Sequence, residues 1–143
     1  MRAKHYRELE VWQLCEEIRR RVIAETARSP AVSDRKFCNQ IRDAAEDAVA
    51  DVAEGFVRFR PGDFAQFLGY ALSSLSEVRE RTRHAHARRF FSDTAAAQIT
   101  VLCVRADRAA RALRQYLWTV APDQVPFHPN AVPRHRHRNR GSR

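Results

Sequence analysis

Arginines recur at every third position in the last apolar segment of the chain, and they are the residues best suited to hold an anion. The set is Arg105, Arg108, Arg111 and Arg114. A guanidinium group donates several hydrogen bonds in a fixed plane and can match two oxygens of a phosphate. Because three residues cover about 300° of a helix, the four side chains spread over a broad outward sector. The pattern predicts a basic, phosphate-binding surface.

The charge of the chain is compatible with a polyanionic partner. The net charge is +9, and only Lys4 and Lys36 are lysines among the 26 basic residues. From Pro122 onward the chain has five arginines and one aspartate, so +5 belongs to the preceding residues. An ordinary ion-paired surface is the alternative, since Glu77 and Arg81 have the spacing of a helical ion pair. The residues leave both interpretations open.

Residue types that serve in catalysis are present, but not at the spacings that catalysis needs. A di-iron site in a helical bundle requires Glu-x-x-His on two helices. The sequence has none, and Glu80 with His84 is the nearest pair. Cys15, Cys38 and Cys103 lie on apolar stripes without C-x-x-C spacing, which favours core thiols in a reducing compartment. Glycines do not cluster into a phosphate-binding loop. We expect no enzyme, no metal and no cofactor.

Four amphipathic helices must position these side chains. Apolar residues recur at spacings of three and four over about 7–28, 34–58, 61–89 and 93–120. Ser33 is a candidate N-cap of the second helix, and Pro61 suits the first position of the third. The second stripe is rich in alanine and allows close approach of another helix. We predict an all-α, antiparallel up-and-down four-helix bundle over residues 1–120 and a disordered Pro/Arg/His-rich tail over 121–143.

The cellular location and the acidic residues give two further expectations. No segment approaches the roughly 18 apolar residues of a membrane span, and the N-terminus lacks a signal-peptide core, so we expect a cytoplasmic protein. The second helix carries acids at spacings of four, four and three that would line one side of it: Asp43, Asp47, Asp51 and Glu54. The arginines of the third helix could pair with them within the domain or between subunits.

Three stretches resemble a known family. They are Tyr6-Arg7-Glu8-Leu9-Glu10-Val11-Trp12-Gln13; then Gln40-Ile41-Arg42, Ala44-Ala45 and Val52-Ala53-Glu54-Gly55-Phe56; then Phe64, Phe67-Leu68, Ala71, Ser74-Leu75 and Glu77. They resemble the four-helix bundle proteins encoded by intervening sequences of bacterial large-subunit ribosomal RNA genes, over roughly residues 6–118. That family includes the accessory variability protein of diversity-generating retroelements. Asp47, Val49 and Asp51 depart from it, because the family usually has Ser, Pro and Asn there.

The resemblance implies a homo-oligomer, a pentameric barrel with a basic surface, and in the retroelement branch a reverse transcriptase and its RNA as partners. With it, we predict a non-catalytic accessory protein that docks a reverse transcriptase and binds RNA or DNA through six arginines: Arg88, Arg89, Arg105, Arg108, Arg111 and Arg114. The alternative is an oligomeric scaffold with a protein-only partner.

Four further residues are candidates for an oligomer or partner interface: Trp12, Arg42, Glu54 and Tyr70. The aromatic side chains could instead stack on nucleic-acid bases, although aromatic residues at helical spacing more often belong to a core or a subunit interface. Glu54 lies in an apolar segment, and we expect its charge to be matched by Arg42 or Arg58 across an interface.

Overall fold

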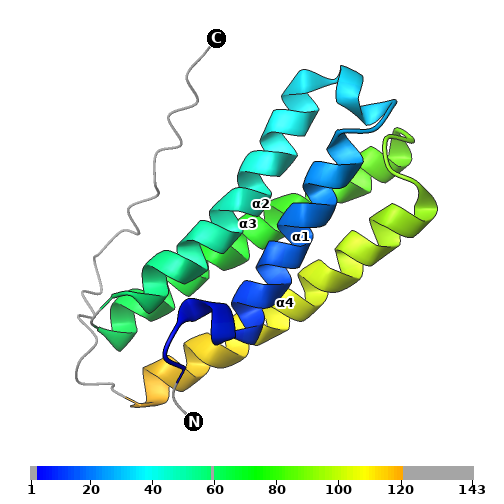
Figure 1. Ribbon diagram of the computed structural model, residues 1–143. Coiled ribbons are helices and arrows are strands. Elements are labelled where there is room, and N and C mark those ends of the chain that lie inside the picture. The colour runs from blue at the N-terminus through cyan, green and yellow to red at the C-terminus, as the bar shows by residue number, and fades with distance from the viewer. Residues whose placement is uncertain (1–2, 59, 121–143) are drawn as a thin grey trace, which may run out of the picture.

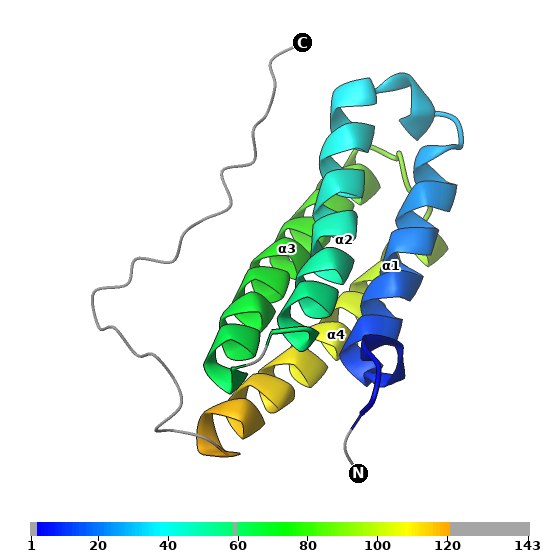
Figure 2. The same cartoon turned by 60° about the vertical axis from the view of Figure 1, so that its left-hand side comes forward.

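The computed structural model describes residues 3–58 and 60–120, which form an antiparallel up-and-down bundle of four α-helices (Figure 1). The helices are α1 (Glu10–Thr26), α2 (Arg35–Phe56), α3 (Pro61–Ala87) and α4 (Asp93–Val120), and short 3-10 turns, η1 (Tyr6–Glu8) and η2 (Ala31–Ser33), precede α1 and α2. Each helix packs against two neighbours in the ring α1, α2, α3, α4, as the second view also shows (Figure 2). The predicted fold class is confirmed. The tail predicted over 121–143 lies outside the described residues.

The helix boundaries follow from local capping. Asp34, rather than the predicted Ser33, caps α2, because Oδ1 of Asp34 accepts a 3.0 Å hydrogen bond from the Phe37 backbone N–H. Ser33 belongs to η2. Pro61 begins α3 as predicted. At the start of α4, the Ser92 hydroxyl accepts from the Ala95 N–H at 3.1 Å. The first helix is shorter than the predicted 7–28, because residues 6–8 form η1 and α1 ends at Thr26.

The turn from α3 to α4 contains a left-handed residue. Arg89 has φ 59°, a region that favours glycine. The Phe90 N–H donates to the Ala85 carbonyl at 2.7 Å and the Arg89 N–H donates to the His86 carbonyl at 3.1 Å. These two bonds are those of a Schellman motif, which satisfies the last carbonyls of a helix and usually has glycine at the left-handed position.

The core is continuous along the bundle and contains the apolar stripes that the sequence predicts. Ile18, Ile41, Leu75 and Ile99, one from each helix, are fully buried. Ala44, Ala45 and Ala48 of α2 are also buried, and larger side chains of α3, such as Leu68 and Leu75, belong to the same core. Gly55 completes this stripe at the end of α2, where α3 packs directly on the backbone of α2.

Candidate nucleic-acid interface

The outward face of α4 carries two arginines with no ion pair among residues 3–58 and 60–120. Arg105 and Arg108 are exposed, while Ala106 and Ala110 point into the core from the same helix. No described carboxylate lies within ion-pairing distance of either guanidinium group. Their charge therefore faces water without neutralisation, and it is available to a polyanion.

Arg111 follows on the same helix, but its charge is matched. Its Nε lies 2.8 Å from Oδ2 of Asp107, one turn earlier, and Nη2 lies 3.5 Å from Oδ1. The hydrogen bond to Asp107 raises the pKa of the Arg111 guanidinium above its ordinary value. Phosphate binding by Arg111 would have to compete with this pair, although exposed ion pairs of this type are weak.

Arg114 belongs to the packing between α3 and α4 rather than to the open surface. Its guanidinium carbon lies 3.8 Å from the position that a Cβ on Gly69 of α3 would occupy. Its Nε is buried and has no hydrogen-bond partner among the residues that the structure describes. The side chain packs beside Gly69 on α3, so the predicted arginine series does not extend to Arg114 as a free cation.

Arg88 and Arg89 lie at the α3–α4 turn and not beside Arg105. Twelve residues of helix from Asp93 to Arg105 span about 18 Å. Nη2 of Arg88 lies 3.0 Å from Oδ2 of Asp34, and its guanidinium carbon is 4.3 Å from the centre of the Phe90 ring. The charge of Arg89 acts on Asp93 and helps to lower the pKa of that carboxyl group, after the larger effect of the His86 ring. The six predicted arginines therefore do not form one patch.

The apolar residues exposed around Arg105 and Arg108 extend this face. Val101 is 58% exposed one turn before Arg105, and Tyr116 is 60% exposed two turns after Arg108. They are two of the four large hydrophobic side chains that are exposed within the described part of the chain. Motif spacing did not reveal this face as a mixed surface, because Val101 and Tyr116 fit no motif.

The four predicted interface residues do not share one surface. Trp12 packs against Tyr6 with ring centres 5.5 Å apart, and its buried indole nitrogen has no hydrogen-bond partner within residues 3–58 and 60–120. Arg42 lies in the first half of α2, where its Nε donates to the Thr26 hydroxyl at 2.6 Å. Glu54 pairs at 2.7 Å with Arg58, one turn later in the same chain and not across an interface as predicted. The ring of Tyr70 contacts the ring of Phe67, 5.4 Å away.

The acids of α2 are divided between the surface and the interior. Asp43 is exposed, whereas Asp51 is only 5% exposed and faces the core. Its charge is near enough to Cys15 to contribute to the raised pKa of that thiol. The spacing predicted that these acids line one side of the helix, and the structure shows that they do not. The pattern failed because Asp51 falls on the boundary between the two faces.

Groups that catalysis would need are buried or already paired. Burial raises the pKa of Cys15 and Cys103 to about 12, which keeps both thiols protonated. Glu80 contacts both Arg83 and His84, at 2.7 Å and 3.1 Å. Residues 3–58 and 60–120 contain no cluster of three or more His, Cys, Asp or Glu that could hold a metal ion. Nor is any helix in these ranges long and apolar enough to cross a membrane.

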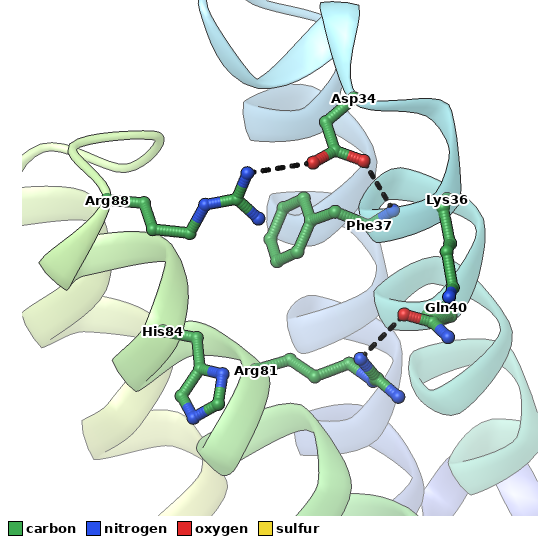
Figure 3. A pocket seen from close by; sticks show the side chains of 7 residues that line it. All are labelled: Asp34, Lys36, Phe37, Gln40, Arg81, His84 and Arg88. Carbon is green, nitrogen blue, oxygen red and sulfur yellow. Dashed lines mark hydrogen bonds and ion pairs between the residues drawn. The ribbon is translucent and has the colours of Figure 1, made fainter.

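A basic cleft lies at the end of the bundle near η2, between the first turns of α2 and the last turns of α3 (Figure 3). No motif or spacing in the sequence indicates this cleft, because its cationic residues come from helices far apart in sequence. Its lining residues are Asp34, Lys36, Phe37, Gln40, Arg81, His84 and Arg88.

The chain matches a known protein family. A family model described as 23S rRNA-intervening sequence protein matches residues 7–111. This range includes α1, α2, α3 and most of α4, with Arg105 and Arg108, and it agrees with the three stretches noted in the sequence. No curated protein matches the chain.

Proposed function

The chain belongs to the 23S rRNA-intervening sequence protein family, and from this premise we propose that it is a non-catalytic protein that binds nucleic acid through the outward face of α4. The observation that carries the proposal is the exposure of Arg105 and Arg108 without a neutralising carboxylate among the described residues. Contacts to phosphate oxygens need only unneutralised cations at the surface, and they release condensed counterions from the nucleic acid.

Two free arginines give a weak site, and repetition would strengthen it. We propose that the protein acts as a homo-oligomer, with the pentamer as the expected form, so that the α4 faces repeat around a ring. Linked weak contacts then act together at a high effective concentration. Phosphate contacts carry no sequence information. Selection of one RNA or DNA would therefore come from a partner protein, for which a reverse transcriptase is our expectation.

Val101 and Tyr116 favour a second candidate function. Exposed apolar side chains beside charged ones are typical of protein interfaces, and tyrosine and arginine are enriched there. The same face could thus hold a protein without any nucleic acid. The two functions differ in salt dependence, because only binding to a polyanion releases many counterions.

The test measures binding of a single-stranded RNA over a range of salt concentrations. Changing Arg105→Ala and Arg108→Ala together should lower the slope of log affinity against log salt by about 1.4 for each subunit that contacts the RNA, at about 0.7 for each phosphate contact. The matched control is Arg20→Ala with Arg83→Ala, which removes the same charge from two arginines that are each 68% exposed but paired with Glu16 or Glu80. The control should keep the wild-type slope.

Two results would overturn the proposal. One is the absence of RNA and DNA binding at low salt, which would leave the protein-only scaffold. The other is an equal loss of slope in the control, which would show that net charge matters and the α4 face does not. Light scattering on the same samples gives the subunit number, so that a monomer can be told from a ring.

A further inference from the structure

The cleft between α2 and α3 concentrates positive charge at one end of the bundle. Its volume is about 250 Å³. Arg88 reaches from α3 toward Asp34, Arg81 reaches toward Gln40 on α2, and the ring of His84 lies on the α3 side (Figure 3). Asp34 is the one carboxylate among the lining residues, so three cationic side chains face one anionic side chain.

The cationic groups are held in place before any ligand arrives. Nε of Arg81 donates to Glu77 at 3.2 Å, and its Nη1 donates to Oε1 of Gln40 at 2.8 Å. Nη2 of Arg88 donates to Asp34 at 3.0 Å, and its guanidinium carbon lies over the Phe90 ring. Each guanidinium group keeps further N–H donors beyond these bonds. Prior ordering of this kind lowers the entropy cost of binding.

The negative charges near the cleft are already engaged. One oxygen of Asp34 accepts from the Phe37 N–H, and the other accepts from Arg88. Glu77 accepts a hydrogen bond from Arg81, and Glu80 is paired with Arg83 and His84. Lys36 is exposed and makes no hydrogen bond or ion pair within the described residues. An anion entering the cleft would therefore meet one free ammonium group and two oriented guanidinium groups.

We propose that this cleft binds a phosphate monoester. A dianionic phosphate has three terminal oxygens, which suits donors that come from two helices, and planar guanidinium groups match such oxygens in pairs. A cleft of 250 Å³ has room for the phosphate and part of the group that carries it. Two sources offer this chemistry, a free phosphate compound and the terminal phosphate of an RNA strand. The site is separate from the α4 face and does not depend on the function proposed for that face.

The experiment records amide and arginine Nε–H signals of the full chain by nuclear magnetic resonance during titration with inorganic phosphate. Chloride keeps the ionic strength constant. The signals of Lys36, Phe37, Arg81 and Arg88 should shift and saturate. Lys36→Gln combined with Arg81→Gln should weaken phosphate binding at least tenfold. If the double variant is unstable, Lys36→Gln alone serves instead, because the position is exposed, and it should also weaken binding.

Arg79→Gln is the matched control, because Arg79 is exposed on the same helix and is not among the residues that line the cleft. It should bind phosphate as the wild type does. Equal weakening by Arg79→Gln, or no saturating shift at the cleft, would overturn the proposal. Arg105→Ala with Arg108→Ala should leave the titration unchanged, so failure of the α4 face and failure of the cleft are distinguishable.

A second titration identifies the source of the phosphate. It compares one short RNA with a 5′-phosphate and the same RNA with a 5′-hydroxyl. Stronger shifts at the cleft with the phosphorylated strand would assign a strand terminus as the ligand. Equal shifts with the two strands, together with saturation by inorganic phosphate, would assign a free phosphate compound.

Discussion

Gly55 of α2 lies directly against Phe67 of α3, and a Cβ placed on Gly55 would be 2.8 Å from the Cβ of Phe67. The same added atom would be 2.7 Å from Cδ2 of Phe64. Carbon atoms that are not bonded pack at about 3.5–4.0 Å. The two helices therefore meet here with no room for a side chain on α2, and Phe67 cannot retreat without moving its own backbone.

Gly55→Ala should consequently destabilise the bundle. Alanine is the better helix former by about 1 kcal/mol, but overpacking of this kind costs about 1–3 kcal/mol or more, and the rigid contact with Phe67 decides the sign. Gly69→Ala is the matched control, because the nearest atoms there are 3.8 Å away and belong to the flexible Arg114 side chain. Urea unfolding should show a lower free energy for Gly55→Ala and an equal or higher one for Gly69→Ala. A Gly55→Ala protein as stable as the wild type would contradict this packing.

Arg89→Gly should raise the free energy of unfolding. A non-glycine residue in the left-handed region costs about 1–2 kcal/mol, and glycine there loses about 0.4–1 kcal/mol through the greater entropy of the unfolded chain. The balance is a gain on the order of 0.5–1 kcal/mol. Arg89→Ala removes the same side-chain charge but keeps the left-handed cost, so thermal unfolding should place it below Arg89→Gly. Equal stability of the two variants would count against a strained turn.

The sequence predicts the helices of this bundle better than it predicts what their side chains do. Periodicity finds α2, α3 and α4 because a helix repeats its buried positions every three or four residues. The alanine stripe of α2 also predicts the close approach now seen at Gly55. Ion pairing within one helix, such as Arg111 with Asp107, follows from a spacing of four and could have been predicted.

Contacts between helices cannot be predicted from the spacing of residues along one helix. The pattern along α2 cannot tell that Asp51 turns inward, because that depends on where α1 and α3 lie. Lys36 and Arg81 line one cleft although 45 positions separate them, and only the antiparallel pairing of α2 with α3 brings them together. Arg114 fits the spacing of the arginine series, and only the packing of α4 against α3 places its side chain beside Gly69.

Asp34 should make stability depend on pH. The Phe37 N–H, and then the Arg88 guanidinium group, hold the pKa of Asp34 below its ordinary value. A lowered pKa means that the charged carboxylate stabilises the fold above the ordinary aspartate range, near pH 4, and that this contribution is lost as the pH falls through the lowered pKa. Asp34→Asn keeps a good N-cap but loses the ion pair.

The measurement for Asp34 is the difference in unfolding free energy between wild type and Asp34→Asn from pH 7 down to pH 2. The difference should be largest near neutral pH and should close at the acid end. Asp43→Asn removes one carboxylate from an exposed position of the same helix and serves as the control. A difference in unfolding free energy that stays constant across this pH range would show that the carboxylate charge contributes nothing to stability.

The three cysteines should be unreactive in the folded protein. Burial raises the pKa of Cys15 and Cys103 to about 12, and it also raises that of Cys38, whose thiol donates to the Ala31 carbonyl. Only the thiolate attacks an alkylating reagent. At pH 8 a thiol of pKa 12 is ionised on the order of a thousandfold less than one near 8.5.

Iodoacetamide at pH 8 should therefore label the native protein only as fast as the chain opens, and three labels should appear at once in denaturant. The less stable Gly55→Ala protein should react faster than Gly69→Ala, because opening exposes the thiols. Mass spectrometry of timed samples gives both rates. Rapid labelling of one cysteine in the native wild type, with no dependence on these variants, would mean that a thiol is accessible and would return nucleophilic chemistry to consideration.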